Sequence, residues 1–183
     1  MISFLKKICC KKEKEKEVYV LKLENNKYYV GESFDKENRI INHKLKKGSS
    51  WTRKYKVINE IPTLTKKQSH YWELTETINL MKLYGVDNVR GSLFTKPFEL
   101  SYYEKIMASQ LYCELNNLCR KCGKSGHFIS NCNNDNISDW VKNFGGHLSF
   151  PNDNKRGCIN CFNLLDGNSP SYQKYCKDCY FQK

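Results

Sequence analysis

Two short segments near the start of the chain carry the residue pattern of a β-hairpin. Residues 18–23 combine β-branched, aromatic and aliphatic side chains, which favours a strand. Residues 24–27 are typical of a turn, and residues 28–31 return as a second run rich in tyrosine. The pattern predicts two antiparallel strands joined by a tight turn.

The following segments alternate between helical and strand-like patterns. Asp35 can cap a helix that runs to about Leu45, and residues 57–61 form a third short strand closed by a proline. Residues 65–84 and 101–115 have the turn-to-turn spacing of helices. We therefore predict an α+β fold in which a small three-stranded antiparallel sheet is flanked by helices.

The charge balance points to a polyanionic partner. The chain has 183 residues, with 31 lysines and arginines, 19 aspartates and glutamates, a net charge of +12 and a pI near 9.2. Nucleic acid is the usual partner of such a chain, although a lysine-rich proteome would give the same balance. The sequence has neither an apolar run of membrane-spanning length nor a signal-peptide core, so we expect no membrane partner and a basic, flexible leader over residues 1–16.

Residues 119–132 carry the spacing C-x2-C-x4-H-x4-C. The candidate ligands are Cys119, Cys122, His127 and Cys132. So short a segment cannot bury a core of its own, and a tetrahedral zinc ion would supply the missing folding free energy. The pattern resembles the CCHC zinc knuckle, and we expect Arg120, Lys124 and Phe128, which lie between the ligands, to contact nucleic acid.

A second set of cysteines lies near the end of the chain, over residues 158–179. Its members are Cys158, Cys161, Cys176 and Cys179. Their spacing suits a four-thiolate zinc site in a zinc ribbon or treble-clef-like module, whose role in nucleic-acid binding, structure or partner docking stays open. Cysteines grouped in this way favour a reducing compartment, the cytoplasm or nucleus, over a secreted disulfide framework. Cys113 and His147 fall outside both spacings, and we expect neither to be a ligand.

An ordered set of residues in the first half of the chain resembles the GIY-YIG endonuclease family. In chain order, the set is Tyr19, Tyr29, Val30, Gly31, Arg39, His43 and Glu76. The domain that the resemblance implies spans residues 17–98. Glu17 and Glu32 depart from the glycine and the lysine that are common in the family. The lysine- and asparagine-rich composition also resembles proteins of large DNA viruses, which would place the protein in a host cell.

The resemblance implies a hydrolase that cuts phosphodiester bonds with one Mg²⁺ or Mn²⁺ ion. Tyr19 is then the candidate general base, Arg39 the phosphate ligand and Glu76 the metal ligand. Tyr29 and His43 would share the proton and position the water or the phosphate. These residue types suit the chemistry, which needs an activated water and charge stabilisation at the phosphate. Taken singly, the tyrosines could instead be ordinary sheet aromatics, and Arg39 and His43 a solvated helix face.

Cations and aromatic residues gather just after the first predicted helix. The candidates for nucleic-acid contact there are Lys44, Lys46, Lys47, Trp51, Arg53 and Lys54. A solvated lysine-rich face around a core tryptophan would look the same. We predict a DNA endonuclease, in which residues 99–118 form a connecting helix and residues 133–157 a linker or irregular segment. The alternatives are a catalytically inactive nucleic-acid-binding zinc protein, including an RNA-binding one, and a zinc-organised adaptor for other proteins.

Overall fold

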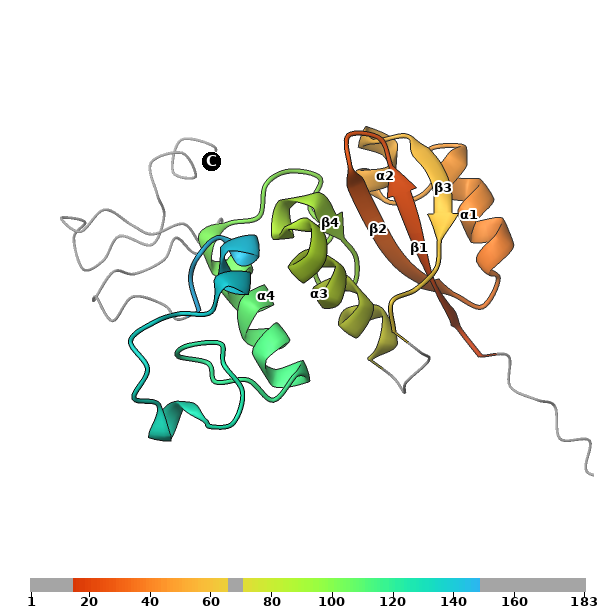
Figure 1. The fold of residues 1–183 in the computed structure, drawn as a ribbon. Helices are drawn as coiled ribbons and strands as arrows, with labels where there is room; N and C mark the ends of the chain where they lie inside the picture. The colour runs from red at the N-terminus through yellow and green to blue at the C-terminus, as the bar shows by residue number, and fades with distance from the viewer. Residues whose placement is uncertain (1–14, 66–70, 149–183) are drawn as a thin grey trace, which may run out of the picture.

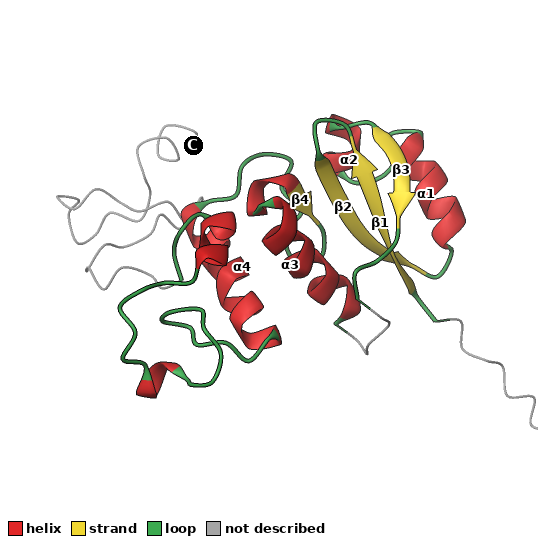
Figure 2. Ribbon diagram, in the orientation of Figure 1, coloured by secondary structure: helices red, strands yellow, loops and turns green. Residues whose placement is uncertain are grey.

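The computed structural model of the chain describes residues 15–65 and 71–148 (Figure 1). It is an α+β fold in which helices cover both faces of a small sheet (Figure 2). The predicted four-cysteine module over residues 158–179 lies outside the described residues, as does most of the predicted leader. Both therefore stay predictions.

The predicted hairpin is confirmed. β1 (Glu17–Leu23) pairs antiparallel with β2 (Lys27–Ser33), and β3 (Val57–Ile61) pairs antiparallel with the other edge of β1. The turn contains Asn25 and Asn26 with φ angles of 58° and 53°, a left-handed backbone that asparagine tolerates better than most residues. The two asparagines thus set the turn that brings β2 back beside β1.

The sheet has one more strand than the sequence predicts. β4 (Val89–Arg90) pairs parallel with β2, so the sheet is mixed, with the strand order β3-β1-β2-β4. The expectation of three antiparallel strands is therefore wrong. A two-residue strand is too short to show a period-two pattern, and its pairing depends on where the preceding helix returns the chain.

The helices on the hairpin side begin at side-chain caps. α1 (Lys36–Lys44) starts after Asp35, which accepts a hydrogen bond from the Asn38 amide at 3.2 Å, as the capping pattern predicts. α2 (Ser50–Lys54) is a short helix that the hydrophobic pattern does not predict, and it starts after a cap at Ser49. Both helices therefore have fixed first turns, which orients the side chains they present to the sheet.

Both longer helices that the sequence predicts are present, but the one predicted over residues 65–84 starts later, at Trp72. α3 (Trp72–Tyr84) ends at Gly85, whose φ of 91° favours glycine. α4 (Tyr102–Leu115) starts with a capping box between Ser101 and Glu104. Short 3-10 helices follow α3 and α4 at η1 (Val86–Asn88), η2 (Ile129–Asn131) and η3 (Asp139–Phe144).

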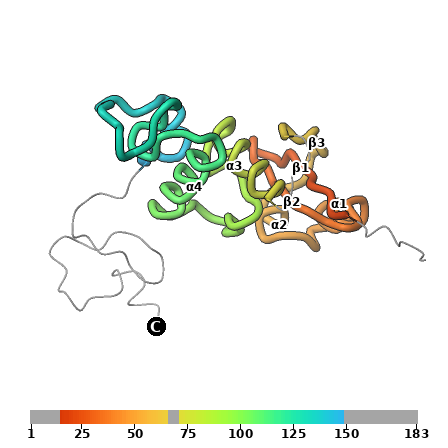
Figure 3. Tube along the Cα trace, turned by 90° about the horizontal axis from the view of Figure 1, so that it is seen from below, coloured from red at the N-terminus to blue at the C-terminus, as the bar shows by residue number. Residues whose placement is uncertain are grey.

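The elements form a row of layers, which Figures 1 and 3 show from two directions. α1 and α2 cover one face of the sheet, α3 covers the other, and α4 packs on the far side of α3. Alternate residues of β1 divide between the two cores: Val18 and Val20 face α3, whereas Tyr19 and Leu21 face α1 and α2. The phenol of Tyr19 is therefore placed on the side of α1.

The hydrophobic core continues past the predicted domain boundary before α4. Leu100, Ala108 of α4 and Phe144 of η3 belong to the same core as β1 and α3. η3 falls in the segment predicted as a linker or irregular segment, yet its Val141 and Phe144 are buried. Residues 99–148 therefore pack onto the sheet domain as a continuous extension of it.

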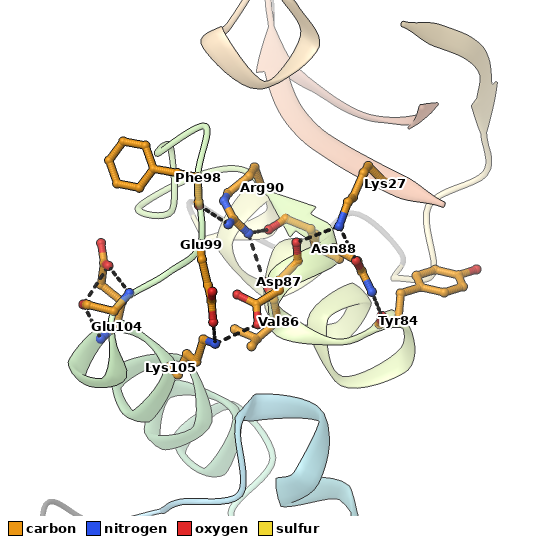
Figure 4. A network of polar contacts seen from close by, with 12 residues as sticks. Lys27, Tyr84, Val86, Asp87, Asn88, Arg90, Phe98, Glu99, Glu104 and Lys105 are labelled. Atoms are coloured by element: carbon orange, nitrogen blue, oxygen red, sulfur yellow. Dashed lines mark hydrogen bonds and ion pairs between the residues drawn. The ribbon is translucent and has the colours of Figure 1, made fainter. Parts of the chain in front are cut away.

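A buried arginine holds β4 in place (Figure 4). The Arg90 side chain is fully buried, and its guanidinium stacks 4.4 Å from the Trp51 ring of α2. The guanidinium donates hydrogen bonds of 2.6–3.0 Å to the carbonyl oxygens of Val86, Val89, Lys96 and Phe98. These acceptors offset the cost of burying a charge, so Arg90 ties the segment after β4 to α2.

Asn88 connects the same network to the hairpin (Figure 4). Its side-chain oxygen accepts a hydrogen bond from Lys27 at 2.6 Å, and its amide nitrogen donates to the Tyr84 carbonyl at 2.7 Å.

Lys105 of α4 pairs with both Asp87 and Glu99 at 2.7 Å. The polar residues around η1 therefore join β2, α3 and α4 into one unit.

Candidate active site and metal centre

The phenol of Tyr19 lies against Gly31, its partner on β2. A Cβ atom at Gly31 would sit 2.5 Å from Tyr19 Oη and 3.0 Å from Cε1 of Tyr29, so a larger residue would displace a phenol. Tyr19 is 1% exposed, and its ring centroid lies 6.4 Å from that of Tyr29. The glycine of the Tyr-Val-Gly sequence thus makes the room that the two tyrosines share.

His43 extends this pair into a buried polar chain. Tyr19 Oη lies 3.0 Å from His43 Nε2, and His43 Nδ1 lies 2.7 Å from Thr52 Oγ1. The centroid of the His43 ring is 4.8 Å from that of the Tyr29 ring. A Cβ atom at Gly48 would fall 2.1 Å from His43 Nδ1, so this glycine lets the loop pass over the imidazole. The structure therefore brings the predicted Tyr19, Tyr29 and His43 together.

Arg39 acts on both phenols, and burial opposes their ionisation. Burial raises the pKa of Tyr19 well above its usual value and Tyr29 adds to the rise, whereas Arg39 opposes it through a hydrogen bond and its charge. Burial likewise raises the pKa of Tyr29, again against Arg39. Burial and then the charge of Arg39 lower the pKa of His43 to about 4. At neutral pH the site therefore holds two phenols, a neutral imidazole and a guanidinium.

Of the two carboxylates on α3, Glu73 is the one whose charge acts on this cluster, whereas the predicted Glu76 is engaged elsewhere. The charge of Glu73 contributes to the raised pKa of both phenols. Glu76, one turn further along α3, is 0% exposed, and its oxygens accept from the Leu64 amide at 2.6 Å and from the Thr65 amide and hydroxyl at 3.0 and 2.5 Å. Glu76 therefore fixes the chain before α3, and its oxygens are engaged there by hydrogen bonds.

Burial and a second carboxylate, Glu32, both act on the pKa of Glu73. Burial raises the pKa of Glu73 and the charge of Glu32 adds to the rise, while a hydrogen bond of 3.0 Å from the Ser92 amide opposes it. Glu32 pairs with Lys16 at 2.6 Å. The charge of Lys16 therefore partly offsets that of Glu32.

The predicted basic surface is exposed, except for its tryptophan. Trp51 is 2% exposed, and its indole N–H donates to the Tyr28 carbonyl at 3.0 Å while Arg90 covers its ring. Trp51 is therefore a core residue, and the prediction that it contacts nucleic acid is wrong. The exposed cations of this surface are Lys44, Lys46, Lys47, Arg53 and Lys54.

The four predicted ligands of residues 119–132 come together as one cluster. The sulfur atoms of Cys119, Cys122 and Cys132 and a ring nitrogen of His127 lie within 4.8 Å of one another. A tetrahedral zinc ion with Zn–S bonds of about 2.3 Å separates its sulfur ligands by about 3.8 Å, so side-chain movements of about 1 Å close this cluster around one ion. These residues are thus placed to hold zinc.

One side of the metal cluster is docked on the protein through Trp140 of η3. The Trp140 indole N–H donates to the Gly123 carbonyl at 2.9 Å, and a Cβ atom at Gly123 would lie 2.8 Å from the indole. Trp140 in turn packs on Tyr112 and Phe144, with ring centroids 4.6 and 5.5 Å apart. On the other side Phe128 is 67% exposed. The cluster therefore has an inner side on the core and an outer side in solvent.

Of the remaining residues considered in this region, two are exposed and two pack against the core. Lys124 and Arg120 are exposed, and Arg120 pairs with Glu114 of α4. Cys113 is buried against the end of η3, and the His147 ring packs on α4. Neither Cys113 nor His147 belongs to the metal cluster, as the spacing predicts.

No protein-family model matches the chain, and neither a curated protein nor a solved structure matches it. Across residues 15–65 and 71–148, no helix is both long and apolar enough to cross a membrane. The function therefore has to be inferred from the chemistry of the site.

Proposed function

We propose that this chain is a divalent-metal-dependent endonuclease that hydrolyses phosphodiester bonds in DNA at a GIY-YIG-like site. The observation that carries the proposal is the buried hydrogen-bonded pair of Tyr19 and His43, with the charges of Arg39 and Glu73 both acting on the phenol. A cation for the phosphate, a proton acceptor for the water and a carboxylate for a metal ion are the three requirements of this hydrolysis.

The proposed reaction uses Tyr19 as a proton carrier. A water attacks the phosphorus and gives its proton to Tyr19 Oη, while the phenolic proton moves to His43 Nε2, 3.0 Å away. The bond from phosphorus to the departing sugar oxygen breaks, and that oxygen takes a proton from solvent. Arg39 holds the non-bridging oxygens with its fork of donors. Because the charge of Arg39 lowers the pKa of His43, pairing Arg39 with a phosphate makes His43 a better acceptor.

Glu73 is the residue that would hold the metal ion. Its carboxylate is a hard oxygen ligand of the kind that Mg²⁺ and Mn²⁺ prefer, whereas the oxygens of Glu76 are engaged by Leu64 and Thr65. A divalent ion bound at Glu73 would supply positive charge for the departing oxygen.

The proposed substrate is single-stranded or branched DNA. The exposed cations on α1 and α2 suit contacts to phosphates, and the exposed Phe128 beside the metal cluster suits stacking on an unpaired base. The rival reading, a catalytically inactive DNA- or RNA-binding protein, draws on Glu32, whose carboxylate would repel a phosphate. The ion pair between Lys16 and Glu32 weakens that objection.

A cleavage screen tests the proposal. Single-stranded, duplex, flap and junction DNA and single-stranded RNA are incubated with the full chain and Mg²⁺, with EDTA as the negative control. We expect metal-dependent cutting of at least one unpaired or branched DNA, reduced about 100-fold or more in Arg39→Ala. Lys142→Ala, which removes an exposed cation of η3 outside the proposed DNA contacts, is the control and should cut within about threefold of the wild type. Binding without cutting on every substrate would favour the inactive binder.

A further inference from the structure

The start of α2 and the loop before it lie against the imidazole that the proposed reaction uses. We propose that Thr52 is a positioning residue that fixes His43 in the tautomer with its proton on Nδ1, leaving the lone pair of Nε2 directed at Tyr19. The catalytic consequence rests on the proposed function, whereas the tautomer is a property of the folded chain alone.

The hydrogen bonds of Thr52 determine the direction of the proton. A threonine hydroxyl has one hydrogen to donate, and a backbone carbonyl can only accept. Thr52 Oγ1 donates to the Ser49 carbonyl at 3.1 Å. Ser49 Oγ, 3.2 Å away, can donate to Thr52 Oγ1. With its own hydrogen directed at the Ser49 carbonyl, Thr52 Oγ1 meets His43 Nδ1, 2.7 Å away, as an acceptor, and Nδ1 then carries the proton.

The other side of the ring fits this assignment. With Nδ1 protonated, Nε2 of the neutral imidazole has a lone pair, and the phenol of Tyr19 donates to it at 3.0 Å. The titratable or charged groups that face the ring are Tyr19 from β1, Tyr29 from β2 and Arg39 from α1. Of these groups only Tyr19 is hydrogen-bonded to the ring, at Nε2, so the partner that orients Nδ1 is Thr52.

The local backbone keeps Thr52 in position. Ser49 caps α2, and its side chain accepts a hydrogen bond from the Thr52 amide at 3.3 Å, while its carbonyl accepts from the Thr52 hydroxyl. Gly48, which precedes the cap, leaves the space that the imidazole occupies. Gly48 thus leaves room for the ring, and Ser49 holds Thr52, whose hydroxyl contacts Nδ1.

The tautomer matters for the proposed proton path. The lone pair on Nε2 can receive the phenolic proton as Tyr19 takes a proton from the attacking water. In the opposite tautomer, Nε2–H would donate to Tyr19 Oη and could accept nothing, so the path would be closed. A side chain with no contact to the substrate would then control the rate of cleavage but not substrate binding.

Nuclear magnetic resonance of the ¹⁵N-labelled full chain tests the tautomer without any activity. In the neutral state, long-range ¹H–¹⁵N correlations of His43 should show a protonated Nδ1 and an unprotonated Nε2. Thr52→Val, which removes the hydroxyl and keeps the shape, should shift His43 toward the Nε2–H form, and Thr52→Ser should preserve the wild-type pattern. A protonated Nε2 in the wild-type chain, or an unchanged pattern in folded Thr52→Val, would overturn the proposal.

Cleavage kinetics separate this proposal from the proposed function. If the chain cuts DNA, Thr52→Val should lower kcat about 10- to 100-fold with little change in KM, and Thr52→Ser should recover most of the loss. Unchanged kcat in Thr52→Val would overturn the catalytic role of Thr52. If no substrate is cut, the proposed function fails, and the resonance pattern still decides whether Thr52 sets the tautomer.

Discussion

The site on the sheet and the metal cluster are built in opposite ways. The metal cluster draws its four ligands from residues 119–132, a single short segment. The site on the sheet draws Tyr19 and Tyr29 from two strands and Arg39 and His43 from a helix, and it adds Glu73 from the far side of the sheet. The first is defined by local spacing, whereas the second exists only once the layers have packed.

The difference shows where each site is vulnerable. The ligands of the metal cluster depend on a chain turn that zinc itself can stabilise, so a change elsewhere in the fold should leave the ligands in reach of one another. In the site on the sheet, Gly31 and Gly48 lie against the Tyr19 and His43 rings, where one added carbon has no room. Substitutions that touch no substrate are therefore expected to disrupt the second site more than the first.

The largest expected effect distinguishes the two carboxylates of α3. If Glu73 holds the metal ion, Glu73→Gln should lower the rate of cleavage about 1,000-fold or more without lowering the melting temperature by more than a few degrees. Glu76→Gln should instead cost about 2–3 kcal/mol of stability and leave the rate of cleavage near that of the wild type, since it replaces one acceptor oxygen for Leu64 and Thr65 with a donor. Single-turnover cleavage and urea unfolding measure the two effects. Equal loss of cleavage in both folded variants would contradict the assignment of Glu73.

Zinc should have the next largest effect, on the other region. Saturation at about 1,000 times its dissociation constant stabilises the metal-bound fold by about 4 kcal/mol, and Trp140 fluorescence should report binding because the indole lies against Gly123. Cys132→Ser should abolish most of this stabilisation, whereas Cys113→Ser, at a buried cysteine outside the cluster, should keep the zinc response. Substitution with Co²⁺ provides an absorption band that identifies the thiolate ligands. Retention of the full zinc response in Cys132→Ser would exclude this ligand set.

Acid should weaken the site on the sheet through His43. Its pKa in the folded chain is about 4, below the usual 6.5, so the unfolded chain binds the proton first as pH falls. The stability contributed by neutral His43 is therefore complete above pH 6.5 and is lost toward pH 4, by on the order of 2–3 kcal/mol. Urea unfolding at a series of pH values measures this slope. His43→Gln should flatten it over that range, and an equal slope in both chains would assign the effect to another group.

Gly31→Ala should have the smallest effect on stability and a larger one on chemistry. The added carbon would sit 2.5 Å from Tyr19 Oη, so we expect a loss of about 1–3 kcal/mol as the phenol moves. Gly126→Ala in the metal cluster is the control for backbone strain alone, because its φ of 86° disfavours alanine while its Cβ atom would meet nothing within 4 Å. The resonance of His43 in the first variant should show the loss of its contact with Tyr19. An unaltered His43 resonance would mean that the strand absorbs the added carbon.

The two regions were also predictable to different degrees. The ligand set of the metal cluster could be predicted from spacing alone, since a tetrahedral ion needs four donors within reach of one turn. The hairpin, the cap at Asp35 and the strand at 57–61 were likewise predictable, because each depends on residues close in the chain. The choice between Glu73 and Glu76 was not, since both lie on one helix and only the packing of α3 decides which one is engaged by Leu64 and Thr65.

Trp51 and Thr52 illustrate the same limit. The sequence places Trp51 among cations, but packing buries it beneath Arg90, so it supports the core and is not accessible to a base. No local pattern marks Thr52, because its role follows from the approach of α2 to α1. A preceding glycine and a capping serine were the available signal, and they indicated a tight turn without revealing which ring it enclosed.

The sequence by itself determined the hairpin, the three longer helices, the four ligands at residues 119–132 and the basic charge, since periodicity, capping and ligand spacing act over a few residues. Only the tertiary structure decided the parallel pairing of β4, the burial of Arg90 and Trp51, and which carboxylate accompanies Tyr19 and His43. These features join segments that are distant in the chain, and close packing, rather than local preference, selects among their alternatives.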